Sequence, residues 1–300
     1  KKADLVTGRA YLAGLAVLGA VALTAIWTIS APRRLPPELL SDMTGDPMAG
    51  KEVFAAAGCA SCHKAEARDA DPLVLSGGRQ FETDFGTFTA PNISMDATHG
   101  IGGWTWPQFA NAVMRGVSPA GAHYYPAFPY TSYIRTDLQD IADLWAYMRT
   151  LPEDATPSGA HDLGFPYTLR RAVGLWKWLY LDADWVVTGP LSPEETRGRY
   201  LAEALAHCAE CHTPRTRLGA LDTMRWHQGA PNPSGRGNIP AIAGTGFSWD
   251  LFDISAYLET GFTPEFDVVG GSMADVVSSL STLPKSDLDA IAAYILRAGQ

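Results

Sequence analysis

The chain has 300 residues, of which 46% are hydrophobic and 18% charged, an ordinary composition for a globular protein. This length predicts two domains rather than one core, and a formal net charge of −9 argues against a general nucleic-acid-binding role. The acidic excess falls in residues 45–155 and 190–300, where it could attract a basic protein partner or simply keep the protein soluble.

An apolar run near the N-terminus predicts a membrane-spanning helix. Residues 11–30, YLAGLAVLGAVALTAIWTIS, contain no charge over a length that can cross a bilayer, and Tyr11 and Trp27 lie near the two interfaces. A cleaved signal peptide is the main alternative, but Pro32 directly follows the best small-residue cleavage site and disfavours cutting there. We expect a cytoplasmic N-terminus at residues 1–10, a transmembrane anchor at 11–31 and a tether at 32–45.

Two short motifs contain all four cysteines of the chain. They are CASCH at residues 59–63 and CAECH at residues 208–212. C-x-x-C-H is the attachment signature of c-type haem, because the two thiols lie on one helical face and the histidine can bind the iron. A disulfide, a redox dithiol or half of a zinc site could also use C-x-x-C, but the following histidine argues against each of them. The sequence predicts two covalently bound haem c groups, held by Cys59, Cys62 and His63 and by Cys208, Cys211 and His212.

Covalent haem attachment also predicts the compartment. It normally takes place outside the cytoplasm, in the bacterial periplasm or its equivalent. We therefore expect a single-pass protein of the inner (cytoplasmic) membrane, with its N-terminus inside and its haem domains in the periplasm. The small excess of basic residues before the apolar run agrees with this orientation.

The sequence around the two motifs repeats at a nearly constant spacing. GWTW at 103–106 matches GFSW at 246–249, and Gly116 matches Gly261. In the closing helix, Thr136-Asp137-Leu138 with Ile141-Ala142 matches Ser286-Asp287-Leu288 with Ile291-Ala292. The offset is 149 residues at the haem motif and between 143 and 150 at the other matches, which indicates duplication of one domain. We expect one domain at 46–155, a linker at 156–189 and a second domain at 190–300.

Each of these domains is expected to be mainly α-helical. Asp46 and Pro47 predict the start of one helix, and Ser192 with Glu195 forms a capping box that predicts another. Alternation with a period of two residues is scarce, so few strands are expected. A helix before C-x-x-C-H, a Gly/Pro-rich middle and a closing helix resemble the class I cytochrome c fold, in which the first and last helices cross.

The two copies differ at the second axial ligand of the iron. A class I haem usually takes a methionine there, and Met273, which follows a Gly-Gly turn, is the candidate in the second copy, with a packing role in the core as the alternative. An offset of 145 places Phe128 at the matching position of the first copy, and phenylalanine cannot bind iron. The first iron is either open or takes a ligand from elsewhere, for which the candidates are His123 first, then Met95, Met114, Met148 and His99.

An aromatic segment at residues 165–190 lies between the two expected domains. It contains Trp176, Trp178, Tyr180 and Trp185. One interpretation is that the segment fills the interface between the domains. The other is that it meets a partner or the membrane surface, with Arg170, Arg171 and Lys177 touching lipid headgroups.

Taken together, these motifs resemble those of a known family. Residues from about 45 to 300 are similar to two-haem c-type cytochromes related to the cytochrome subunits of membrane-bound alcohol and gluconate dehydrogenases. The matching pieces are APNIS…GIGGW (90–104), HYYPAFPYTSY (123–133), HCAECHTPR (207–215), LGALD (218–222) and DVVGGSMADVV (267–277). Relatives often carry methionine at the position of Phe128 or of Thr136, so the resemblance does not identify the sixth ligand of the first iron. Dehydrogenase subunits often carry three haems, so it does not identify a substrate either.

The function implied is electron transfer rather than catalysis. The resemblance implies a membrane-tethered carrier that passes electrons between a periplasmic dehydrogenase or cytochrome complex and an oxidase or another cytochrome. Its partners would be redox proteins and, through the N-terminal helix, the membrane, and we expect no catalytic residue and no nucleic acid. The alternative is a two-haem oxidoreductase acting on a small substrate, or a gas sensor, at an open first haem.

Overall fold

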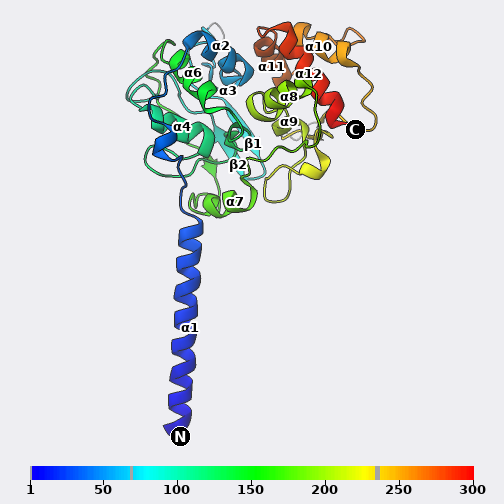
Figure 1. The fold of residues 1–300 in the computed structure, drawn as a ribbon. Coiled ribbons are helices and arrows are strands. Elements are labelled where there is room, and N and C mark those ends of the chain that lie inside the picture. The colour runs from blue at the N-terminus through cyan, green and yellow to red at the C-terminus, as the bar shows by residue number, and fades with distance from the viewer. Residues whose placement is uncertain (1, 68–69, 234–236) are drawn as a thin grey trace.

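The chain forms one long N-terminal helix and a helical body that meets the C-terminal end of this helix (Figure 1). The computed structural model describes residues 2–67, 70–233 and 237–300. Lys1 and the side chains of residues 2–10, where we expect the cytoplasmic N-terminus, lie outside this description. The long helix α1 spans Lys2–Ile29.

Within the described residues, α1 is the one helix long and apolar enough to cross a membrane. Its stretch Tyr11–Ile29 has a mean hydropathy of 2.1, and none of the tested window is buried. A core helix of a soluble protein would be largely buried, so the exposure of α1 leaves a membrane anchor or a signal sequence as its interpretation.

Residues 32–45, expected to be a tether, lie against the body rather than hanging free. The backbone N–H of Leu35 donates to Asn111 Oδ1 at 2.7 Å, and the indole of Trp106 donates to the carbonyl of Leu40 at 3.1 Å. Leu40 is itself buried in the core. Both partners belong to α4 (Trp106–Arg115), so this helix holds the segment that leads out of α1.

Two pairs of helices form the frame of the body. Helix α2 (Pro47–Ala56) packs on α6 (Leu138–Met148), and α8 (Pro193–Arg199) packs on α12 (Lys285–Ala298). Each crossing requires a glycine: a Cβ on Gly50 would lie 1.9 Å from the carbonyl oxygen of Asp143, and one on Gly198 would lie 1.8 Å from that of Ala290. Large buried side chains of α2, α6 and α12, and of the segment that follows α8, belong to one continuous hydrophobic cluster.

The predicted starts of α2 and α8, the first helix of each copy, are confirmed. The carboxylate of Asp46 accepts from the backbone N–H of Met48 at 2.8 Å and caps α2, which has a proline in its first turn. Ser192 and Glu195 form a reciprocal capping box at the start of α8. Both caps satisfy backbone donors that a helix leaves free at its N-terminus.

The structure gives a smaller offset between the two closing helices than the sequence match suggested. Helices α6 and α12 begin at Leu138 and Lys285, and the glycine contacts pair Asp143 with Ala290. Both observations give an offset of 147 residues, so the predicted match of Leu138 with Leu288, at an offset of 150, is wrong by almost one helical turn.

One additional residue in the second copy is accommodated by a change of helix type. Cys59 follows Gly50 by nine residues, whereas Cys208 follows Gly198 by ten. The chain at Tyr200–Leu205, labelled η2, is a π-helix that continues α8. A π segment takes up one residue without breaking the helix, and such insertions are often found at functional sites.

The remaining elements are short. The helices are α3 (Cys59–His63), α5 (Tyr130–Tyr133), α7 (Ala172–Tyr180), α9 (Ala209–His212), α10 (Leu251–Thr260) and α11 (Ser272–Leu280), with 3-10 turns η1 (Pro37–Leu39) and η3 (Thr223–Arg225). Strands β1 (Gln80–Thr83), β2 (Gly86–Thr89) and β3 (Asp162–Leu163) form an antiparallel sheet in that order, and β4 (Ala230–Pro231) pairs with β5 (Asn238–Ile239). The expected mainly helical fold with few strands is confirmed for the described residues.

Candidate haem sites

The two cysteine motifs begin in the same way. A residue with positive φ precedes the first cysteine of each, Gly58 at 60° and His207 at 41°. This backbone conformation ends the preceding helix and turns the chain into the one-turn helices α3 and α9. A positive φ is unusual for histidine, and the ring of His207 packs edge-on against that of Tyr133 at a centroid distance of 5.6 Å.

Each motif histidine is oriented by a proline carbonyl. His63 Nδ1 bonds to the carbonyl oxygen of Pro91, and His212 Nδ1 to that of Pro240, both at 2.8 Å and both 28 residues along the chain. A carbonyl only accepts, so Nδ1 carries the proton and Nε2 keeps its lone pair. In the described part of the chain neither Nε2 forms a hydrogen bond. This is the tautomer and orientation that an iron-binding histidine requires.

The chemistry of the thiols also fits haem attachment. Burial raises the pKa of the Cys59 thiol and of the Cys208 thiol to about 12, and it raises the pKa values of Cys62 and Cys211 as well. Redox dithiols and zinc-binding cysteines depend on lowered thiol pKa values instead. No group of three or more metal-binding side chains occurs among the described residues. The residues fit a thioether-linked haem because each motif offers two thiols three residues apart and a histidine whose Nε2 keeps its lone pair.

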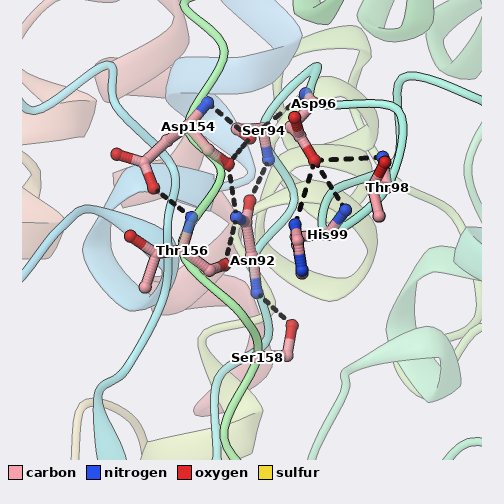
Figure 2. A network of polar contacts seen from close by, with 8 residues as sticks. All are labelled: Asn92, Ser94, Asp96, Thr98, His99, Asp154, Thr156 and Ser158. Atoms are coloured by element: carbon pink, nitrogen blue, oxygen red, sulfur yellow. Dashed lines mark hydrogen bonds and ion pairs between the residues drawn. The ribbon is translucent and has the colours of Figure 1, made fainter.

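The loop that carries Pro91 is held by a network that the sequence did not reveal (Figure 2). The buried side chain of Asn92 donates from Nδ2 to the carbonyls of Asp154 and Thr156 at 2.7 and 2.8 Å. Its Oδ1 accepts from the backbone N–H of Ser94 at 2.8 Å, and its own backbone N–H donates to Ser158 Oγ at 2.9 Å. The start of the expected linker, at Thr156 and Ser158, is thus hydrogen-bonded to the loop whose Pro91 carbonyl orients His63.

Replacing Asn92 with alanine should destabilise the first haem site. The substitution removes a donor from two carbonyls: that of Asp154 keeps a bond from Ser94 Oγ at 3.0 Å, and that of Thr156 loses its described partner, which costs about 1–3 kcal/mol. Guanidinium unfolding followed by haem absorbance measures this loss. Asn238→Ala, at an exposed position, is the matched control. An Asn92→Ala protein as stable as this control would contradict the role assigned to the network.

The two motifs lie close to each other. Thr131 Oγ1 donates to Glu210 Oε1, inside the second motif, at 2.8 Å. Helix α5, which carries Thr131, also packs on the π segment just before the second motif. Together with the contact between Tyr133 and His207, these interactions bring the two candidate haem sites next to each other.

Asp275 connects the helix of Met273 to the first motif. Its carboxylate accepts from Lys64 Nζ at 2.7 Å and from Arg79 Nη1 at 3.0 Å. Burial alone would raise the pKa of Asp275, but the hydrogen bonds from these two cations outweigh it and lower the pKa. Met273 is the second residue of α11, is half-buried and packs against the core.

The structure supports the correspondence of Phe128 with Met273. Gly116 and Gly261 end α4 and α10 in the left-handed conformation. Directly after them the two chains repeat the same turn at an offset of 145 residues: Val117 bridges to His123 and Phe262 to Val268. Phe128 lies five residues beyond His123, as Met273 lies five beyond Val268, and it is surrounded by three tyrosine rings at centroid distances of 6.0–6.3 Å.

His123, the first candidate for the sixth ligand of the first iron, lies at the junction with α1. Its ring is 2% exposed, and Nε2 is 2.9 Å from the carbonyl oxygen of Ser30. Its role as an iron ligand stays a prediction, and this contact gives Nε2 another partner. Met114 and Met148 are buried in α4 and α6, Met95 packs against the core, and His99 is exposed and lies 3.5 Å from Asp96.

A second network, also missed from the sequence, lies behind the second motif. Glu203, in the π segment, is 1% exposed and accepts from the backbone N–H groups of Val186 and Val187 at 2.8 and 3.0 Å. It also accepts from the Tyr294 hydroxyl at 2.6 Å. His227 stacks on Trp226 nearby and is fully buried, and neither of its ring nitrogens has a partner among the residues that the structure describes. An acceptor supplied from outside the chain, such as a haem propionate, would satisfy it.

Comparison with known proteins agrees with this arrangement. Residues 47–152 match the family described as cytochrome c. The chain is 50% identical over 290 residues to "Diheme cytochrome c-type" of Cereibacter sphaeroides, covering 96% of this chain and 98% of that protein. It is 36% identical over 252 residues to the fructose dehydrogenase cytochrome subunit of Gluconobacter japonicus, covering 82% and 51% of the two chains.

A further relative is the cytochrome c subunit of the quinone alcohol dehydrogenase of Gluconacetobacter polyoxogenes. Identity is 34% over 253 residues, which cover 79% of this chain and 52% of the relative. The chain therefore spans about half the length of the dehydrogenase cytochrome subunits that it matches.

Proposed function

This chain belongs to the diheme c-type cytochromes, relatives of the cytochrome c subunits of membrane-bound dehydrogenases, and we propose that it is a membrane-tethered electron carrier with two covalently attached haem groups. Electron transfer is the function that the family implies. The observation that carries the proposal is the repeated pairing of a C-x-x-C-H histidine with a proline carbonyl 28 residues later, which leaves Nε2 free for iron.

Each haem is held by one motif in this proposal. Cys59 and Cys62 form the two thioethers of the first haem, and His63 binds its iron. Cys208, Cys211 and His212 do the same for the second haem, with Met273 as its second axial ligand. Haem supplies the one-electron couple, and the chain orients the histidines, buries the ring and sets the potential through ligand and burial.

The body consists, in this proposal, of two tandem class I cytochrome c domains, at 46–155 and 190–300, with a linker at 156–189. The repeated glycine crossings of α2 on α6 and of α8 on α12 support a duplicated unit. The shared hydrophobic cluster and the contact between Thr131 and Glu210 support a fixed arrangement of the two units. Electrons can then pass between neighbouring haems without movement of the domains.

We assign α1 as a single-pass anchor in the inner membrane at 11–31, with the haem domains in the periplasm. The support is its apolar, unburied length and the proposed haem attachment outside the cytoplasm. Tethering keeps an electron carrier at a high effective concentration near membrane partners. The electron donor would be a periplasmic dehydrogenase or cytochrome complex, and the acceptor an oxidase or another cytochrome.

A second candidate function uses the first haem as a binding site. Phe128 lies at the position that corresponds to Met273 and packs among tyrosines, so this side of the first haem has no methionine from that turn. An open iron would bind a small gas or reduce a small substrate such as peroxide.

Purification of the full chain from membranes in mild detergent tests the proposed function. We expect two one-electron steps in a potentiometric titration, reduction by a co-purified or added membrane dehydrogenase, and no reaction of either reduced haem with peroxide faster than free haem. A carrier that is not reduced by any respiratory donor but turns over peroxide would favour the second function.

Asp275→Asn should weaken the bond between Met273 and the second iron. Without the carboxylate, α11 loses its two ion pairs with Lys64 and Arg79, and the methionine is more easily displaced. We expect the loss of the methionine–iron absorption band on raising pH to occur about one pH unit lower, equivalent to about 1.4 kcal/mol. Glu259→Gln, an exposed site on α10, is the charge-matched control. Identical pH profiles would show that the ion pairs do not position Met273.

A further inference from the structure

Large apolar side chains remain exposed beside the end of α1. Helix α7 forms the underside of the body next to the last turn of α1 (Figure 1). Exposed large side chains on α7 and the loop before it are Phe165, Tyr167, Leu169, Trp178 and Leu179, and Leu218 is exposed on a neighbouring loop. Phe165, Leu169, Trp178, Leu179 and Leu218 are here called the basal patch. The indole of Trp176 donates to the carbonyl of Leu218 at 2.8 Å, which fixes the Leu218 loop to α7.

Helix α7 is fixed to the end of α1 by several contacts. The guanidinium of Arg171 lies 4.1 Å from the ring centroid of Trp27 and donates to Ser30 Oγ at 2.9 Å. The backbone approach is close, because a Cβ on Gly174 would lie 2.2 Å from the carbonyl oxygen of Ser30. The segment after α1 is in turn bonded to α4 through Leu35. These contacts therefore fix the position of the body relative to the C-terminal end of α1.

These contacts place the basal patch at the membrane surface if α1 spans the bilayer. Trp27 lies in the last turn of the apolar run Tyr11–Ile29, where tryptophan favours the headgroup region. Helix α7 touches Trp27, so its exposed residues lie close to the same level. Trp178 is 60% and Phe165 81% exposed, and aromatic and leucine side chains are those with which interfacial helices enter a bilayer.

The three basic residues of this segment are bonded within the protein, and their contact with headgroups, one of the two interpretations above, stays a prediction. Arg170 lies 4.6 Å from the ring centroid of Tyr125 and donates to the carbonyl of His123. Arg171 is bound to α1, as described above. Lys177 is 8% exposed and donates to the carbonyls at positions 115 and 116, each at 2.7 Å. We therefore assign the contact with lipid to the apolar side chains of the basal patch.

We propose that the basal patch inserts into the headgroup region of the bilayer that α1 crosses, so that the body rests on the membrane instead of turning freely on a stalk. This inference depends on the proposed anchoring of α1. The contact fixes the orientation of the body and turns the side formed by α10 and α11 away from the membrane, toward soluble partners (Figure 1).

Site-directed spin labelling of the haem-loaded full chain tests the inference. With the native cysteines linked to haem, a single introduced cysteine carries the label: Trp178→Cys or Phe165→Cys in the basal patch, Val17→Cys in α1, or Phe252→Cys on α10, which is 73% exposed at its native residue. The protein is placed in nanodiscs of phosphatidylcholine, with and without phosphatidylglycerol. Relaxation by oxygen is compared with relaxation by a water-soluble nickel chelate.

We expect the oxygen-to-nickel ratio at positions 165 and 178 to exceed that at 252 several-fold in both lipid mixtures, with position 17 higher still. Ratios at 165 and 178 equal to that at 252, with position 17 in the bilayer, would overturn the inference and leave the anchor intact. A water-exposed position 17 would overturn the anchor itself. A rise in the ratio seen only with phosphatidylglycerol would indicate an ionic contact with lipid. Equal shielding in lipid-free amphipol would indicate a contact within the protein. Either outcome would also overturn the inference.

Discussion

Exchanging the residues at positions 128 and 273 should exchange the ligand states of the two haems. Met273→Phe removes the thioether from the second iron, which becomes five-coordinate when reduced and binds carbon monoxide. Methionine stabilises the reduced iron, so the potential of the second haem should fall by about 100–200 mV, within the range over which axial ligands act. Phe128→Met should have the opposite effect on the first haem.

Optical spectra, carbon monoxide binding and potentiometry of the two variants measure this exchange. Met148→Leu, which changes a buried methionine of α6 without touching either turn, is the control for packing. A Met273→Phe protein in which both haems keep their spectra and potentials would show that Met273 is a core residue. An unchanged first haem in Phe128→Met would show that another side chain already occupies its sixth position.

A single methyl group at either helix crossing should strongly destabilise the body. Gly50→Ala and Gly198→Ala each place a Cβ within 2 Å of a backbone carbonyl oxygen on the partner helix. A backbone clash cannot be relieved by a rotamer change, so α2 must move from α6, or α8 from α12. We expect a loss of about 3 kcal/mol or more in the free energy of unfolding.

Guanidinium unfolding followed by the haem absorbance measures this effect. The matched control is Gly270→Ala, because a Cβ there meets nothing within 4 Å and its φ is not positive. This control should change stability by less than about 0.5 kcal/mol. Equal stabilities of Gly50→Ala and Gly270→Ala would show that the helices of the first pair do not approach as closely as described.

Features encoded in a few neighbouring residues could be predicted from the sequence. The caps at Asp46 and Ser192 depend on side chains that bond to backbone two or three residues away, so their pattern is local. The same holds for the two C-x-x-C-H motifs and for the turn after Gly116, whose copy after Gly261 has the same spacing. The position that corresponds to Met273 could therefore be found by counting from that turn.

Features that depend on distant segments could not be predicted. The carbonyl partner of His63 is separated from it by a β-hairpin, and the only signal is that both motifs are followed, 28 residues later, by P-x-I. Glu203 is a charged helical residue of the kind that usually faces solvent, but every residue from Leu201 to Leu205 is buried in the core. The match of Asp137-Leu138 and Ile141-Ala142 with Asp287-Leu288 and Ile291-Ala292 misled the alignment of the closing helix, because a shift of three residues, almost one helical turn, keeps apolar residues on the same face.

Contacts between the two copies could not be predicted from neighbouring residues either. Asp275 and Lys64 are 211 residues apart, and nothing in either neighbourhood indicates the ion pair. Arg171 and Lys177 are charged residues in an aromatic segment, a pattern typical of a membrane surface, yet they bond to α1 and to the end of α4. Such contacts are decided by tertiary packing, which composition does not encode.

The most direct test of two covalent haem sites is the intact mass of the denatured chain. The wild-type protein should carry the mass of two haem groups after denaturation, because thioether bonds survive it. Cys59→Ala/Cys62→Ala should carry one haem, with the spectrum of the methionine-bound site, and Cys208→Ala/Cys211→Ala should carry one haem without it. A wild-type chain that loses its haem on denaturation, or a double variant that still retains two, would contradict the assignment of one haem to each motif.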